Sequence, residues 1–237
     1  YVYDSSMTSA MTNEFEGAIY VWQKVANLKF IQRTTEANFI IVTNDGVAVG
    51  SPSDSYVGMV GGPQLLRINT LFPQMDWAHE LGHAMGMIHE QQRSDRDTYV
   101  KINWGNFTAA SLTNGYAAAN YGILSNSINI GSYDYDSIME YPTVDGNVAR
   151  TNGNPTACSD SSCSEITPLE PYYSAPGSPP LGQTTHLSTG DLAAMAGKYG
   201  TPRTISGHVY NGFNGPFAGV TVNISGGTFE GGGDTGA

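Results

Sequence analysis

The feature that most constrains this chain is the stretch from His79 to His89, which follows the pattern HExxHxxGxxH. His79 and His83 are four positions apart, so on a helix their rings project from one face, where two imidazoles can bind one Zn²⁺ ion. A third ligand cannot come from the same straight helix, and Gly86 supplies a residue that tolerates the positive φ of a sharp turn. That turn would bring His89 back to the metal. Three protein ligands and one open position are typical of a catalytic zinc site.

A chance match is the alternative to a metal site, because the short form HExxH also occurs in unrelated proteins. The longer form fixes five positions in eleven, and three of the five histidines of the chain lie inside it. The pattern therefore predicts a catalytic zinc with His79, His83 and His89 as ligands. Glu80 is rotated away from the ligand direction and would contact a water molecule on the metal instead.

Length and charge narrow the class of protein. A chain of 237 residues, 40% of them hydrophobic, is long enough to bury a hydrophobic core. It can form one large domain, or one domain and a fragment of another. The net charge of −11 disfavours nucleic acid and anionic membrane surfaces as partners. No apolar run reaches the ~18 residues that span a membrane, and no signal peptide is recognisable. A secreted protein would therefore need its leader and pro-segment upstream.

Two cysteines, Cys158 and Cys163, lie close together in the sequence. In a secreted protein we expect them to form a disulfide that closes a small loop. Such a loop contributes roughly 2 kcal/mol, largely as a local effect. A pair of metal-binding thiols is the alternative, although the sequence offers no two further ligands nearby.

The residues after the zinc motif narrow the family. Glu90 follows the third histidine, and Ser137–Tyr141 reads SIMEY. Together with HExxHxxGxxH, these residues resemble the astacin family of metzincin endopeptidases over about residues 1–200. The resemblance implies one zinc ion per chain and a buried turn methionine, Met139. It also implies that Tyr141 ligates zinc at rest, swings out when substrate binds, and donates a hydrogen bond to the reaction intermediate. A buried core tyrosine is the alternative for this residue.

The same resemblance implies an α+β fold of two subdomains. A twisted mixed sheet and the active-site helix would lie above a cleft, and the C-terminal subdomain would be largely irregular. Substrate would add to an edge strand that contains Tyr56 and Val57, through main-chain hydrogen bonds. An ordinary edge strand without substrate contact is the alternative.

Three features depart from the family pattern. Glu140 replaces the usual histidine of the SIMEY turn and adds negative charge near the zinc. Cysteine is missing where animal members carry two disulfides, which favours a bacterial member. Family members tie the residue equivalent to Glu90 to the mature N-terminus, but Tyr1 falls well inside the family pattern, so Arg93 or Arg96 could pair with Glu90 instead.

Hydrophobic periodicity predicts the other elements. Apolar residues that recur every three or four positions predict a helix over about 6–27, and the zinc helix should run from about Asp76 to Met85. A further helix should begin at a cap around Ser188 and end at Gly200. Strands are expected at Lys29–Arg33, Asn38–Thr43, Ser55–Val60 and Gln64–Asn69.

We place the domain boundary at Pro202. The catalytic domain would cover 1–202, with an N-terminal subdomain of about 1–89 and a C-terminal subdomain of about 90–202.

Beyond the boundary, Thr204–Tyr210 and Val220–Ser225 alternate as strands and resemble the opening of a carboxypeptidase-regulatory-like, immunoglobulin-type β-sandwich. Such a sandwich needs about 100 residues. Residues 203–237 would thus be the start of a truncated β domain or a short β appendage.

These observations predict a secreted, zinc-dependent endopeptidase that hydrolyses peptide bonds in protein substrates as a monomer. Zinc would activate a water molecule, and Glu80 would take its proton as general base and deliver it to the leaving amine. One alternative is a latent scaffold or adhesion protein that acts through the C-terminal β segment. Another metzincin branch is a further alternative, which Glu90 and the SIMEY turn disfavour.

Overall fold

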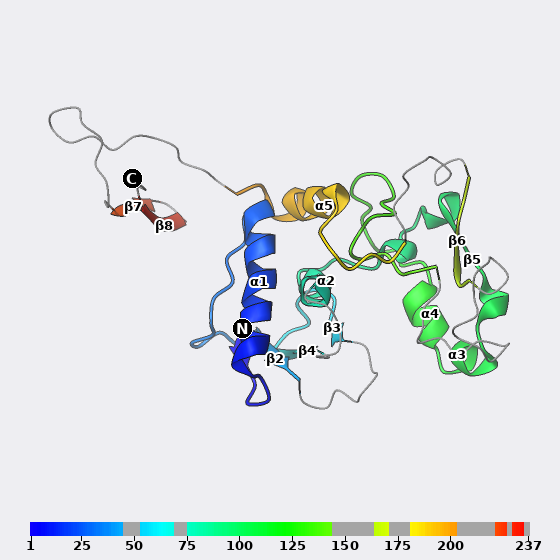
Figure 1. The fold of residues 1–237 in the computed structure, drawn as a ribbon, viewed down its shortest axis with the longest axis horizontal. Helices are drawn as coiled ribbons and strands as arrows, with labels where there is room; N and C mark the ends of the chain where they lie inside the picture. Colours follow the sequence, from blue (N-terminus) through cyan, green and yellow to red (C-terminus); the bar gives the residue numbers. More distant parts are fainter. Residues whose placement is uncertain are drawn as a thin grey trace. The chain divides into compact units, whose positions relative to one another are not determined.

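The computed structural model describes the chain in several ranges with gaps between them. These are residues 1–44, 53–68, 75–143, 164–170 and 181–202, and the backbone of 221–226 and 229–234. The chain divides into two compact units, Tyr1–Pro202 and Arg203–Ala237 (Figure 1).

A four-stranded mixed sheet lies in the N-terminal half of the first unit. Its strands are β1 (Val2–Tyr3), β2 (Phe39–Thr43), β3 (Asp54–Ser55) and β4 (Pro63–Arg67), in the order β1-β2-β4-β3. β2 runs parallel to both β1 and β4, whereas β3 pairs antiparallel to β4 at the sheet edge. Val42 of β2 lies opposite Leu66 of β4, and both side chains are fully buried. One face of the sheet therefore contributes to the core.

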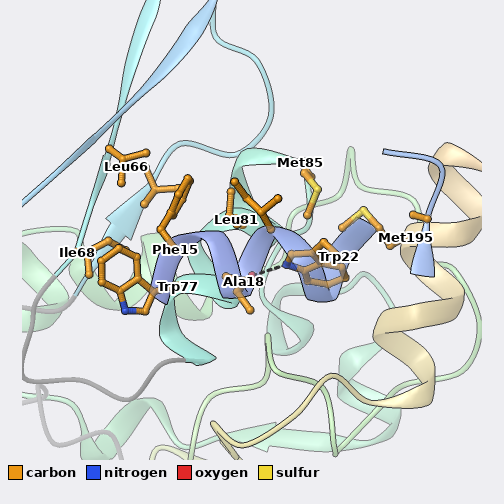
Figure 2. Packing of buried hydrophobic residues seen from close by; sticks show 13 residues of the cluster. Phe15, Ala18, Trp22, Leu66, Ile68, Trp77, Leu81, Met85 and Met195 are labelled. Carbon is orange, nitrogen blue, oxygen red and sulfur yellow. Dashed lines mark hydrogen bonds between the residues drawn. The ribbon is translucent and has the colours of Figure 1, made fainter. Parts of the chain in front are cut away.

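Two helices pack with the sheet in one hydrophobic cluster (Figure 2). α1 (Ser9–Val25) begins after Thr8, whose hydroxyl accepts a hydrogen bond from the Met11 N–H at 3.3 Å and so caps the helix. α2 (Met75–Ala84) carries the first two histidines of the zinc motif. Its inner face buries Trp77, whose ring centroid lies 6.1 Å from that of Phe15 on α1.

Trp22 and Gly82 fix the position of α2 against its neighbours. The fully buried indole of Trp22 donates its Nε1–H to the Ala78 carbonyl at 2.9 Å, which joins α1 to α2 (Figure 2). A Cβ atom on Gly82 would lie 3.6 Å from Cζ2 of Trp22 and 3.0 Å from Sδ of Met139. Glycine thus lets α2 lie close to α1 on one side and to the segment around Met139 on the other.

The second half of the first unit consists of short elements joined by irregular segments, as predicted. They are η1 (Glu90–Gln92), η2 (Arg96–Thr98), β5 (Val100–Ile102), η3 (Trp104–Asn106), α3 (Ala109–Thr113), α4 (Tyr116–Tyr121) and β6 (Ile166–Pro168). β5 and β6 pair antiparallel. A second hydrophobic cluster, which includes Phe107, Tyr121 and Ile166, holds these elements together.

The predicted C-terminal helix is confirmed as α5 (Thr189–Tyr199). Ser188 caps it: its hydroxyl accepts from the Asp191 N–H at 3.0 Å, and the Asp191 carboxylate accepts from the Ser188 N–H at 2.9 Å. The far end of α5 is tied to the end of α2, because the Tyr199 hydroxyl donates to the Met85 carbonyl at 2.8 Å. α5 therefore packs in the same core as the zinc helix.

Two expected strands are wrong in whole or in part. Lys29–Arg33 is not a strand, although Tyr1 bonds to it twice: its N-terminal amine donates to the Ile31 carbonyl and its carbonyl accepts from the Arg33 N–H, both at 2.8 Å. Ser55–Val60 shortens to the end of β3. There Gly58, with φ of 70°, turns the chain, and its N–H donates to the His83 carbonyl on α2 at 2.8 Å.

The second unit contains one antiparallel hairpin among its described residues, formed by β7 (Thr221–Gly226) and β8 (Phe229–Asp234). β7 corresponds to the strand expected at Val220–Ser225. The expected strand Thr204–Tyr210 and the pair Cys158 and Cys163 lie outside the described residues. Of the helices that the described ranges contain, none is long and apolar enough to cross a membrane.

Candidate active site

α2 and the turn after it bring three histidines together. His79 and His83 lie one turn apart on α2, with ring centroids 4.7 Å apart. At the helix end Gly86 takes a φ of 96°, and its N–H donates to the His83 carbonyl at 2.7 Å. The reversal places the His89 ring 4.5 Å from that of His83 and 5.3 Å from that of His79. One nitrogen atom from each of the three rings lies within 4.8 Å of the other two.

Hydrogen bonds around these rings leave Nε2 atoms for a metal. His79 Nδ1 lies 2.7 Å from the Ile138 carbonyl oxygen, and His83 Nδ1 lies 2.9 Å from the Met87 carbonyl oxygen. Because a carbonyl oxygen only accepts, both Nδ1 atoms carry the proton and both Nε2 atoms hold a lone pair. The Nε2 atoms of His83 and His89 lie 3.1 Å apart. When each of these two atoms holds a lone pair, a cation between them can bind both.

Burial keeps the three imidazoles neutral. Desolvation is the main cause that lowers the pKa of each ring, and neighbouring histidines add to the shift for His83 and His89. The pKa of His83 falls to about 3. The neutral ring is the form that binds a metal, so three desolvated imidazoles that face one another fit a zinc ion.

Glu80 turns a buried carboxylate toward the same space as the histidines. The residue is 6% exposed, and its Oε2 atom is buried without a hydrogen-bond partner among the described residues. Burial raises its pKa well above the usual carboxyl value, and the charges of Asp54 and Asp76 raise it further. An unpartnered buried oxygen is costly. A water molecule or substrate atom in the site would supply the missing contact.

The histidines and Glu80 open into a cleft of about 660 Å³. Ser53, Asp54 and Ser55 line its rim at the sheet edge. Tyr56 and Val57, which the resemblance places on the substrate-binding edge, follow β3 and are 52% and 48% exposed, outside the described lining of the cleft. Their contact with substrate stays a prediction.

The SIMEY turn supports the zinc motif from the other side. Met139 is fully buried, and its sulfur lies 3.0 Å from the place of a Cβ on Gly82. The Ile138 carbonyl accepts the hydrogen bond from His79. Asp191, in the first turn of α5, accepts from the Ser137 hydroxyl at 2.6 Å and from the Ile138 N–H at 2.9 Å. This carboxylate therefore holds the peptide that orients His79.

Tyr141 reaches the cleft from the end of the turn. Its ring centroid lies 4.3 Å from that of His89, and its hydroxyl donates to Oδ1 of Asn120 on α4 at 3.2 Å. Nδ2 of Asn120 donates to the Tyr116 carbonyl at 3.0 Å, which directs Oδ1 toward Tyr141. Sequence reasoning missed Asn120, since a lone asparagine in a short helix gives no signal of its own.

Comparison with known proteins settles the family. The family model for astacin, a peptidase family, matches residues 1–200. The chain belongs to the astacin family. It is 35% identical over 147 residues to zinc metalloproteinase nas-31 of Caenorhabditis elegans, in a match that covers 60% of this chain and 22% of the relative. It is 38% identical over 143 residues to high choriolytic enzyme 1 of Oryzias latipes, in a match that covers 60% of this chain and 49% of the relative. The chain thus spans half or less of the length of these relatives.

Solved structures agree with this assignment. The structure of high choriolytic enzyme 1, a hatching enzyme zinc-protease from Oryzias latipes, matches with a TM-score of 0.66 and 30% identity over 85% of this chain and 88% of that one. The structure of myroilysin shares the fold, with a TM-score of 0.51, 19% identity, and coverage of 86% and 91%. The chain thus belongs to a family of zinc metalloendopeptidases and has an α+β fold, and the triad of His79, His83 and His89 fits the zinc site. The predicted family, fold class, enzyme class and cofactor are confirmed.

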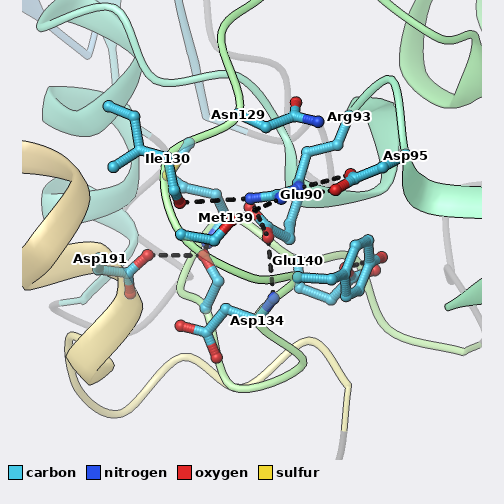
Figure 3. A network of polar contacts seen from close by, with 12 residues as sticks. Glu90, Arg93, Asp95, Asn129, Ile130, Asp134, Met139, Glu140 and Asp191 are labelled. Carbon is cyan, nitrogen blue, oxygen red and sulfur yellow. Dashed lines mark hydrogen bonds and ion pairs between the residues drawn. The ribbon is translucent and has the colours of Figure 1, made fainter. Parts of the chain in front are cut away.

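Glu90, the residue after the third histidine of this astacin, belongs to a polar network (Figure 3). Its Oε1 atom accepts from the Asp134 N–H at 2.9 Å and lies 3.2 Å from Nη1 of Arg93. Arg93 also pairs with Asp95 at 2.9 Å. Burial raises the pKa of Glu90 to about 7, although the charge of Arg93 opposes the shift. Of the two arginines considered as partners, Arg93 is the observed one, whereas Arg96 pairs with its sequence neighbour.

Glu140, the departure from the astacin turn, is 3% exposed. Its Oε2 atom accepts a hydrogen bond from the Tyr133 hydroxyl, while Oε1 is buried without a partner within the described ranges. Burial raises the pKa of Glu140 well above its usual value. The neutral acid is therefore favoured, which limits the charge that this residue adds near the zinc.

Replacing Asp191 with asparagine is expected to weaken zinc binding by about 10–100-fold. The amide can accept only through one oxygen, so the bonds from Ser137 and Ile138 cannot both be kept, and the carbonyl that orients His79 shifts. Competition with a chelator would measure the affinity. Asp136→Asn, which removes a carboxylate that pairs with His186 on the surface at 2.9 Å, is the matched control. Unchanged affinity in a folded Asp191→Asn protein would contradict this role.

Proposed function

We propose that this astacin is a secreted endopeptidase that cleaves peptide bonds in protein substrates, with Glu80 as general base and acid. The observation that carries the proposal is the buried Oε2 of Glu80, which has no hydrogen-bond partner among the described residues and lines one cleft together with three neutral imidazoles. A structural zinc has four protein ligands and needs neither an open cleft nor such a carboxylate beside it.

His79, His83 and His89 would hold the zinc ion, which supplies Lewis-acid activation of a water molecule and of the scissile carbonyl. Glu80 accepts the proton of that water. The protonated Glu80 then donates the same proton to the leaving amine. One residue thus serves both halves of the reaction.

Tyr141 is proposed to ligate zinc at rest and to act as a hydrogen-bond donor during the reaction. Its ring lies against His89, and Asn120 holds its hydroxyl at the cleft wall. From that wall the hydroxyl donates to the oxygen that gains negative charge when the carbonyl is attacked. Met139 and Glu90 have structural roles beside the site, and Gly86 makes the turn that presents His89.

For the whole chain we propose residues 1–202 as the catalytic domain of a monomer whose precursor carries a pro-segment upstream. The compact unit Tyr1–Pro202, which contains every residue assigned to the site, supports this division. Residues 203–237 are proposed as the start of a β domain.

The test is hydrolysis of casein by the purified chain before and after 1,10-phenanthroline, with zinc then added back. We expect chelation to abolish hydrolysis and zinc to restore it, because Glu80 and Tyr141 act only with the metal in place. Hydrolysis that resists chelation would contradict a zinc peptidase. A chain that holds zinc by elemental analysis and cleaves nothing would instead favour the latent scaffold.

A further inference from the structure

The charged side chains in the described lining of the cleft are acidic. Its described lining includes four acidic residues, Asp54, Asp76, Glu80 and Glu140, and neither lysine nor arginine. Low-dielectric walls focus the field of such charges into the cleft, and the net charge of −11 over the whole chain has the same sign. The charge of Arg67 offsets that of Asp54, and burial favours the neutral acid at Glu140, so Asp76 is the carboxylate that offers a negative charge beside the zinc site.

Three of these four carboxyl groups already have a role. Asp54 pairs with Arg67 through an ion pair of 2.8 Å. Glu140 accepts a hydrogen bond in the protein interior. Glu80 faces the three histidines as the proposed base. Asp76 remains.

Asp76 belongs to the lining of the cleft, beside the proposed zinc site. It lies in the first turn of α2, three residues before His79 and four before Glu80, so the three side chains share the face that lines the cleft. The Asp76 carboxylate has no hydrogen bond or ion pair to the residues that the structure describes. Burial alone raises its pKa to about 6, so at neutral pH it is ionised, half-buried and without a counter-ion among those residues.

Helix stabilisation does not account for this placement. An aspartate in the first turn of a helix interacts favourably with the helix dipole. That interaction acts equally on a fully solvated side chain, and it gives no reason to turn the carboxylate into the cleft and desolvate it. A cation that enters the cleft would pair with the carboxylate and so offset the cost of its desolvation.

We propose that Asp76 is a specificity-determining residue that binds the ammonium or guanidinium group of a substrate lysine or arginine beside the scissile bond. The proposal rests on the endopeptidase function proposed above. One helical turn of about 5.4 Å separates Asp76 from Glu80, a span that the side chain of a residue next to the cleaved bond can bridge. Asp54, paired with Arg67, borders the same space.

Quenched fluorogenic peptides of one parent sequence would test the proposal. Each carries lysine, glutamine or glutamate at one position, scanned across both sides of the cleaved bond, and mass spectrometry confirms the cut. At one position beside the bond we expect kcat/KM to be about tenfold higher for lysine than for glutamine. Asp76→Asn should bring that ratio to within about twofold, and Asp76→Lys should turn the preference toward glutamate.

The control is Glu14→Gln, which removes one negative charge from an exposed position on α1 and should leave the lysine-to-glutamine ratio unchanged. A ratio that survives Asp76→Asn, or a wild-type chain with no basic preference at any position, would overturn the proposal. If Asp76→Asn fails to bind zinc, Asp76→Ser, which keeps a first-turn acceptor, takes its place. A zinc-loaded wild type that cleaves none of the peptides would overturn the endopeptidase function itself.

Discussion

Glu80→Gln is expected to lower kcat for peptide hydrolysis by about 10²–10⁴-fold while the protein keeps its zinc. Glutamine has the shape of glutamate and fits the buried position, but its amide cannot take a proton from water. The bonds that orient the ligands, from His79 to Ile138 and from His83 to Met87, do not involve Glu80. Single-turnover hydrolysis of one peptide, together with zinc content by elemental analysis, would measure both parts of the expectation.

The same variant has a second readout that separates catalysis from structure. Because the folded pKa of Glu80 is raised above its unfolded value, ionising it opposes folding at pH values above that unfolded pKa of 4.5. The cost grows as the pH rises toward the folded pKa. A neutral glutamine removes it, so the zinc-free variant should melt at a higher temperature than the zinc-free wild type at pH 7, and the gain should vanish below pH 4.5.

Glu14→Gln, on the exposed face of α1, is the matched substitution for both measurements and should change neither. Near-normal turnover by Glu80→Gln would refute the assigned base. Loss of zinc from Glu80→Gln would show that the carboxylate also helps to hold the metal.

The zinc site could be predicted from sequence because its ligands lie within eleven residues. Helix geometry relates His79 to His83, and one glycine turn, at Gly86, relates both to His89; no distant part of the chain is needed. The cap of α5 is local in the same way, since Ser188 and Asp191 bond each other across one turn.

The supporting contacts could not be predicted, because they depend on packing between distant segments. Asp191 reaches the Ile138 N–H across 53 positions, and Tyr141 reaches Asn120 across 21. The strand expected at Ser55–Val60 fails for the same reason: Gly58 gives its N–H to the zinc helix instead of a neighbouring strand. Periodicity reports which face of an element is buried, but not which distant residue lies against it.

Tyr141→Phe is expected to lower kcat by about 10²–10³-fold, with a smaller change in KM and with zinc retained. Phenylalanine keeps the ring contact with His89 at 4.3 Å and that with Tyr121 at 5.5 Å, so the cleft wall stays packed. What it loses is the hydroxyl, whose donated hydrogen bond matters only when charge develops on the substrate oxygen. Steady-state kinetics with one peptide and zinc analysis would check this.

Asn120→Ala tests whether the hydroxyl works from the position that the structure gives it. The variant keeps the Tyr141 hydroxyl but removes the acceptor that holds it at 3.2 Å, so a smaller loss of kcat is expected. The double variant should be no slower than Tyr141→Phe alone, because Asn120 acts only through that hydroxyl. Additive losses would give Asn120 a role of its own. Wild-type kcat in Tyr141→Phe would reduce Tyr141 to a packing residue and leave the charge on the substrate oxygen without a hydrogen bond from this side chain.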